Sequence, residues 1–144
     1  MYKDAITLFN QKPGDRGNPD AWYPTVIENV NLNVDRAAIL AKYGPESQDK
    51  AVLFVRYTTD GENILVSGKH WTLPKEWPGA GDSLTFGTDG DFFWQGEWTD
   101  GIVTDEQYGS EGFYGYMNRT HDNVFSVTAV AKYSVIPHFE IMGK

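Results

Sequence analysis

The sequence predicts an all-β fold, namely a small, mostly antiparallel β-barrel or sandwich with long loops and one or two short helical turns. Aromatic residues make up 15% of the chain and glycine occurs 15 times, a combination typical of short twisted strands joined by tight turns. Several short apolar stretches also follow one another with Gly, Pro, Asn or Asp between them. At 144 residues, the chain is expected to form one domain covering residues 1–144.

The first part of the chain predicts three strands. Residues 5–10 alternate imperfectly between apolar and polar side chains, and the QKPGDRGNPD stretch after them indicates an exposed loop. Residues 22–30 predict a second strand, in which Pro24 cannot donate a ladder hydrogen bond and therefore favours an edge or a strand start. Residues 51–58 predict the third, and Asp60-Gly61 after them is a strong turn signal.

Two stretches are less β-like. Residues 37–41, before Gly44-Pro45, predict one or two helical turns, either on a surface loop packed against the core or on a segment that docks on a neighbouring subunit. Residues 109–123 are the other helical candidate, although Gly112 and Gly115 lower the helix propensity. Further strands are expected at 63–67, 83–87, 92–97, 123–133 and 137–142.

Charge and composition exclude several classes of protein. The net charge is −8 and no stretch gathers Lys and Arg into a stripe, which disfavours tight wrapping of nucleic acid. No cysteine is present, so a reducing cytosol suits the chain. The N-terminal MYKDAITLF lacks the apolar core of a signal peptide, and no apolar run reaches membrane-spanning length. We therefore expect a soluble intracellular product with no membrane partner.

The sequence carries no signature of catalysis or metal binding. His70, His121 and His138 lie far apart, in no HxxH or HExxH spacing. Neither a GxSxG elbow nor a GxxxxGK[ST] phosphate loop is present. Most aspartates stand beside Gly, Asn or Pro, where carboxylates usually accept hydrogen bonds from turn amides. We expect no enzyme, cofactor or metal site.

The stretch DGDFFWQGEWTDG, residues 89–101, places four large aromatic rings between acidic residues and glycines. It allows a sugar-binding face, a glycosidase pair of Asp91 with Glu97, or the framework of a β-domain. Strand alternation separates two sets of side chains: Asp91, Phe93, Gln95 and Glu97 on one face, and Phe92, Trp94, Gly96 and Trp98 on the other. The second face is large and apolar, which favours framework. A carbohydrate-binding module stays the alternative, with these candidate platforms: Trp71, Trp77, Trp94, Trp98, Tyr114 and Tyr116.

Five segments in order resemble a group of small tailed-phage proteins described as minor capsid, head-closure or stopper proteins. They are MYKDAITLFN, NLNVDRAAILAKYGPESQDKAVLFVRY, WTLPKEW, DFFWQGEW and VFSVTAVAKYSVIPHFEIMGK. Together they cover most of the chain, and LPKEW and the closing IPHFE strand are the strongest parts. The YGSEGFYGYMNRTHDN stretch departs from the pattern of a head-closure barrel, which leaves an adaptor or a tail terminator as other members of the same neck.

The resemblance implies a virion protein of the neck, made in the host cytoplasm, with no enzyme activity and no cofactor. Its β-barrel protomer would join a hexameric or dodecameric ring that closes the DNA exit channel. The implied partners are a portal or adaptor ring on the head side, and a tail terminator or tail tube on the other. Packaged DNA would pass through the lumen without tight binding, which agrees with the acidic chain because carboxylates repel phosphates.

On this basis we expect loops to make the contacts. The segments able to reach neighbours are 11–21, 35–50 and 79–90. The candidate interface residues are Arg36, Tyr43, Lys75, Glu76, Tyr114 and Arg119. The candidate channel or gating loops contain Glu62, Asn63, Gly79, Gly81 and Asp82. The structural alternatives are ordinary hairpin turns for both loops, and, for WTLPKEW, two tryptophans that anchor the segment and leave its charges exposed.

Overall fold

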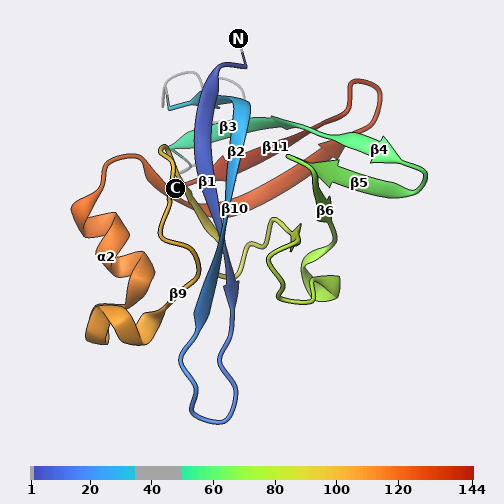
Figure 1. Cartoon of the computed structure of the whole chain (residues 1–144). Coiled ribbons are helices and arrows are strands. Elements are labelled where there is room, and N and C mark those ends of the chain that lie inside the picture. Colours follow the sequence, from blue (N-terminus) through green and yellow to red (C-terminus); the bar gives the residue numbers. More distant parts are fainter. Residues whose placement is uncertain (1, 35–49) are drawn as a thin grey trace.

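The protein is mostly β, as the sequence predicts. The structure is a computed structural model that describes residues 2–34 and 50–144 (Figure 1). The predicted helical turns at 37–41 lie outside those ranges. In chain order the elements are β1 (Asp4–Lys12), β2 (Ala21–Asn33), β3 (Ala51–Arg56), β4 (Thr58–Asp60), β5 (Asn63–Val66), β6 (Lys69–Trp71), η1 (Pro74–Glu76), β7 (Ser83–Leu84), β8 (Phe92–Trp94), β9 (Val103–Thr104), η2 (Asp105–Glu111), α2 (Gly112–Thr120), β10 (Val124–Tyr133) and β11 (His138–Gly143).

Six strands close into an antiparallel barrel in the order β1, β8, β10, β11, β3, β2, because β1 pairs with both β8 and β2. The long strand β2 pairs with β1 and β9 near its start, and its residues 31–33 pair with β3. Pro24 lies opposite Phe9 of β1, in the part of β2 that neither β9 nor β3 reaches. At Pro24, β2 therefore pairs with one neighbour only, as an edge strand does, although other parts of the same strand pair on both sides. This agrees with the edge position that the proline predicts.

A second, four-stranded sheet runs in the order β4, β5, β6, β7 and continues the chain beyond β3. Asp60 pairs with Asn63, so β4 and β5 are joined by a two-residue turn, and Gly61 there has a φ of 63°. Glycine tolerates that left-handed conformation, which confirms the turn predicted after Asp60. In Figure 1 this hairpin and the turn between β10 and β11 both extend from the barrel toward the same side.

The barrel interior is filled by side chains from all six of its strands. The ring of Phe139 is the hub, with its centroid 5.1 Å from Tyr57, 5.0 Å from Trp71 and 4.9 Å from Phe86. The buried members of this barrel cluster are Ile6, Leu8, Ile27, Val30, Ala51, Leu53, Val55, Tyr57, Val66, Leu84, Phe86, Phe93, Phe125, Val127, Phe139 and Ile141.

A second cluster lies outside the barrel, where α2 packs near β1, β8 and β9 (Figure 1). Its buried members are Phe9, Trp22, Phe92, Val103, Phe113, Met117 and Val124. The carboxylate of Asp105 orders the start of α2, because its Oδ1 accepts hydrogen bonds from Phe113 N at 2.9 Å and Trp22 Nε1 at 2.7 Å. The predicted helical turns in 109–123 are thus confirmed. Gly112, which lowers the helix propensity, stands at the helix entry with a φ of 75°.

Two predicted strands are shorter than expected. In 83–87 only the two residues of β7 pair with another strand. Beyond β7, backbone groups bond to side chains instead: Asn10 Nδ2 donates to Thr85 O at 2.7 Å, and Gly87 N donates to the Asp91 carboxylate at 2.8 Å. In 92–97 the strand ends at Trp94, and Thr7 Oγ1 bonds to Gly96 O at 2.8 Å. The predicted strand 51–58 is divided between β3 and β4 at Tyr57. The prediction missed β4 as a separate strand, and it also missed β6, β9 and η1, each of two or three residues.

Candidate functional site

The segment WTLPKEW, residues 71–77, crosses the edge of the molecule between β6 and β7. Trp71 packs on the barrel hub, and the ring of Trp77 meets the ring of Tyr23 edge-on at 5.7 Å. Between them, Pro74 begins η1 after the extended residue Leu73, a position that suits proline because its missing N–H is not needed there. The two tryptophans therefore anchor the segment, and Lys75 and Glu76 between them are exposed.

A groove of about 550 Å³ separates this segment from the loop that precedes β8. One wall is formed by residues 73–76 and the other by Gly87, Thr88 and Asp89. Leu73 leaves 55% of its surface exposed, and with Pro74 it supplies apolar surface to the groove. Lys75, Glu76 and Asp89 place charges along its lining. We call this feature the LPKE groove.

A buried polar network stands behind the groove and holds its second wall. The Asp91 carboxylate accepts hydrogen bonds from Asn10 Nδ2 at 2.8 Å, Gln11 N at 2.9 Å and Gly87 N at 2.8 Å. Burial raises the pKa of Asp91, and the three hydrogen bonds oppose that rise. The carboxylate thus ties the loop to β1, a structural role that accounts for it without any pairing with the exposed Glu97.

The other candidate interface residues lie apart from this groove. Tyr114 is half-buried on α2, with its ring 5.0 Å from the ring of Phe92. Arg119, also on α2, makes a two-pronged contact with Glu111, from Nε at 2.6 Å and from Nη2 at 3.1 Å. Figure 1 places α2 and β6 on opposite sides of the barrel. Arg36 and Tyr43, together with most of the 35–50 segment, lie outside the described residues.

The two candidate gating loops are short, and local hydrogen bonds hold their ends together. Glu62 and Asn63 belong to the tight turn between β4 and β5. In the other loop, Gly79 lies against the Lys12 side chain, and Ser83 N and Oγ both approach Ala80 O, at 3.4 and 3.3 Å. Gly81 and Asp82 are exposed there, and Asp82 partly offsets the lowering of the Lys69 pKa by burial. Both loops have the geometry of ordinary turns, and gating stays a prediction.

The aromatic residues of 89–101 are framework. Phe92 and Phe93 point to opposite faces of β8, and both are fully buried, one in the cluster under α2 and the other in the barrel. Trp94 and Trp98 pack against the outer cluster. No tryptophan in the described part of the chain, which holds all five, is more than half-exposed, so a flat tryptophan platform for a sugar ring finds no support.

A feature that the sequence reasoning missed is the turn between β10 and β11. Val135 exposes 96% and Ile136 72% of its surface, and Tyr133 at the start of the turn is 45% exposed. Figure 1 shows this turn projecting beyond the barrel, at the red end of the colour bar. We call residues 133–137 the hairpin knob. The one available signal was the aliphatic pair in Ser-Val-Ile-Pro, which stands between two predicted strands where polar turn residues are usual.

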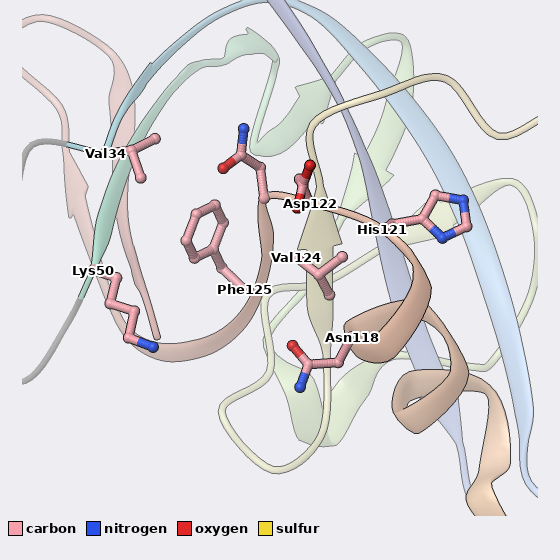
Figure 2. Close-up of a pocket in the computed structure, with 8 residues that line it drawn as sticks. Val34, Lys50, Asn118, His121, Asp122, Val124 and Phe125 are labelled. Atoms are coloured by element: carbon pink, nitrogen blue, oxygen red, sulfur yellow. The ribbon is translucent and has the colours of Figure 1, made fainter.

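A second hollow of about 420 Å³ lies between Lys50 and the end of α2 (Figure 2). Figure 2 shows Phe125 and Val124 in its wall, with Val34 and Lys50 on its far side. The ring of His121 turns away from Phe125 in this view and meets Trp94 edge-on at 5.0 Å.

The described residues contain no group of three or more His, Cys, Asp or Glu side chains placed to hold a metal ion. Likewise, none of the helices described is both long and apolar enough to cross a bilayer.

Fold and site together define a small β-barrel protein with an apolar groove, a projecting apolar turn and a helix packed on its outside. The chain belongs to a family of unknown function, DUF6751, whose model matches residues 1–144. Neither the curated proteins nor the solved structures contain a match to it.

Proposed function

We propose that the protein is a structural virion protein of the tailed-phage neck, a ring-forming head-to-tail connector of the head-closure type. In this role it seals the DNA exit channel and offers the surface on which the tail docks. The observation that carries the proposal is the hairpin knob, which holds two aliphatic side chains in water at the end of a projecting hairpin.

The energetic argument concerns Val135 and Ile136. Full burial of an aliphatic side chain of this size is worth about 1.5–3 kcal/mol. Isolated exposed apolar residues are common, but a neighbouring pair at the tip of a projection is typical of a surface that a protein partner covers. The knob therefore supports an assembling subunit more than a small-molecule enzyme.

The resemblance to head-closure proteins also supports the role of an assembling subunit. Its two strongest parts are LPKEW and IPHFE, and they fall at the two interaction features. LPKEW includes one wall of the LPKE groove, while IPHFE runs from the knob into β11. A charge of −8 also suits a ring through which DNA passes, because an acidic lumen does not retain phosphates.

The test is deletion of the gene from its phage, with electron microscopy of the lysate and plasmid-borne wild-type gene as the control. We expect emptied or leaking heads beside free, complete tails, and tailed virions again on complementation. Intact, tailed, DNA-filled particles from the deletion phage would reject the proposal.

A further inference from the structure

We propose that the hairpin knob of one copy inserts into the LPKE groove of a second copy, so that copies of this chain associate head to tail. This inference names the contact between subunits of the ring and rests on the proposed function for the role of that ring. The contact itself follows from features of this chain alone.

The knob is held in shape before any partner arrives. Tyr133 pairs with His138 across the hairpin, and their rings stack with centroids 4.8 Å apart and planes 9° apart. His138 Nδ1 donates to Ile136 O at 2.6 Å, and the Tyr57 hydroxyl donates to Tyr133 O at 2.8 Å. Because these bonds fix the turn, little conformational entropy is lost when its tip is buried in a partner.

The groove is also fixed in shape, and part of its lining is apolar. Trp71 and Trp77 anchor both ends of its first wall, and the Asp91 network holds the second. Its volume of about 550 Å³ lies within the range of pockets that enclose a sizeable ligand. Leu73, which is 55% exposed in this wall, offers a contact to an inserted aliphatic pair.

The two features are distant within one molecule. Figure 1 shows the β10–β11 turn well separated from β6 and from the segment that follows β6. A knob therefore reaches a groove only on another copy.

The groove lining has an excess of one negative charge, and the base of the knob carries an exposed lysine. The groove lining carries one lysine, Lys75, against two carboxylates, Glu76 and Asp89. The tip of the knob is uncharged, and Lys132 is exposed at its base. Apolar contact together with nearby charged residues is the usual composition of a specific protein interface.

Because the knob and the groove are different surfaces, each copy offers one of each. Such a contact repeats from copy to copy and closes a ring when the rotation between copies allows it. A contact between two knobs would instead be symmetric and would stop at a dimer.

The experiment uses two variants, one with charged substitutions in the knob and the other with a charged substitution in the groove. The knob variant carries Val135→Asp and Ile136→Asp, and the groove variant carries Leu73→Asp. The control is Ile102→Asp, since Ile102 is 54% exposed but belongs to neither surface. Size-exclusion chromatography with light scattering gives the mass of each species, and thermal melts followed by circular dichroism report folding. Milder versions with serine at the same positions repeat the test without added charge.

We expect the wild-type protein and the Ile102→Asp variant to form oligomers of equal mass. The knob variant and the groove variant should each be monomeric with unchanged melting curves, with self-association weaker by at least about tenfold. Their 1:1 mixture should form a heterodimer, because one intact knob meets one intact groove.

Three results would overturn the inference: a wild-type protein that stays monomeric, a knob variant that assembles like the wild type, or a mixture that stays monomeric while the wild type assembles. None of these depends on the phage experiment. Knob-dependent oligomers together with normal virions from the deletion phage would reject the neck proposal and leave this contact standing.

Discussion

Phe93 and Phe92 are consecutive residues of β8, yet their rings serve two different regions of the molecule. Phe93 lies inside a barrel that is closed by strand pairing on every side. Phe92 lies in the outer cluster, which is covered by one helix and bordered by half-buried aromatic residues. The barrel cluster thus has hydrogen-bonded walls, while the outer cluster is held mainly by side chains.

This difference predicts two levels of stability. Loss of a barrel side chain disturbs the strands of a closed sheet, and therefore affects the stability of the whole fold. Loss of a side chain under α2 disturbs a helix of nine residues, and a helix so short is marginal without its packing partners. Opening of the outer cluster is therefore expected to cost less than global unfolding.

The largest effect is expected for Phe139→Ala, at the hub of the barrel cluster. Removing its fully buried ring should lower the free energy of unfolding by about 3–5 kcal/mol. Urea denaturation followed by circular dichroism measures this loss. Phe54→Ala on neighbouring β3 is the matched control, since Phe54 is only half-buried and should cost clearly less. Equal losses in the two variants would contradict the central position of Phe139.

Phe113→Ala tests the outer cluster. Its ring centroid lies 5.0 Å from Phe9, 5.7 Å from Phe92 and 5.2 Å from Trp98. We expect a loss in the free energy of unfolding of about 3 kcal/mol, the lower end for a buried phenylalanine, because the half-buried rings of Trp98 and Tyr108 beside it can relax into the space. Hydrogen exchange should show little protection left in η2 and α2, whereas β3 and β11 stay clearly protected, because the outer cluster can open while the barrel remains folded. Phe113→Leu should restore most of the protection.

If the Phe113→Ala variant instead loses protection equally in the helix and in the barrel strands, the two clusters form a single cooperative unit. The proposed difference between them would then be wrong.

The class of fold and most long strands could be predicted from the sequence, for a physical reason. In β1, β2, β3, β10 and β11, one face meets the barrel interior, so alternation or an apolar run is visible in the residues themselves. The short strands β6 and β9 owe their existence to partners far away in the chain, and no local pattern marks them. The ladder beyond β7 is likewise replaced by contacts from Asn10 and Asp91, which lie outside that segment.

The candidate site was accessible only in part. LPKEW drew attention through its charges between two tryptophans, and the structure places it in a groove wall. The second wall, from Gly87 to Asp89, comes from another segment, so the groove is a tertiary feature. The knob was missed because an aliphatic pair next to a strand is normally expected to be buried; only the three-dimensional structure shows Val135 in solvent.

Asp105 joins the outer cluster to α2 and offers a sharper test of it. In Asp105→Ala, the buried Trp22 Nε1 and Phe113 N both lose their acceptor, which should cost about 1–3 kcal/mol. Asp105→Asn keeps an oxygen at Oδ1 and should cost less than half of that. Urea denaturation of both variants measures the difference. Similar losses would mean that the negative charge, rather than the acceptor, is what stabilises the helix start.

The smallest effect at neutral pH is expected for Asp91→Asn, at the junction where β8 leaves the groove loop. An asparagine with its Oδ1 at the present Oδ2 position keeps the bonds from Asn10 and Gly87, and leaves one donor, Gln11 N, without its acceptor. A second effect opposes this loss, because the substitution removes a buried charge. We expect a net loss of about 1 kcal/mol at pH 7.

The pH dependence of that loss has a defined sign. Burial raises the pKa of Asp91 in the folded protein. The folded state therefore holds the proton of the Asp91 carboxyl group more tightly than the unfolded chain, in which aspartates have a pKa of about 3.9. The stabilisation from this group is complete below that value and is lost as pH rises through the raised pKa. The advantage in stability of the wild type over Asp91→Asn should therefore shrink from acidic to neutral pH, as measured by urea denaturation along a pH series.

Asp89→Asn, which removes an exposed carboxylate from the same loop, is the control for a general effect of charge. A difference that grows with pH would show that the three hydrogen bonds outweigh burial, and that Asp91 stabilises this junction as an anion.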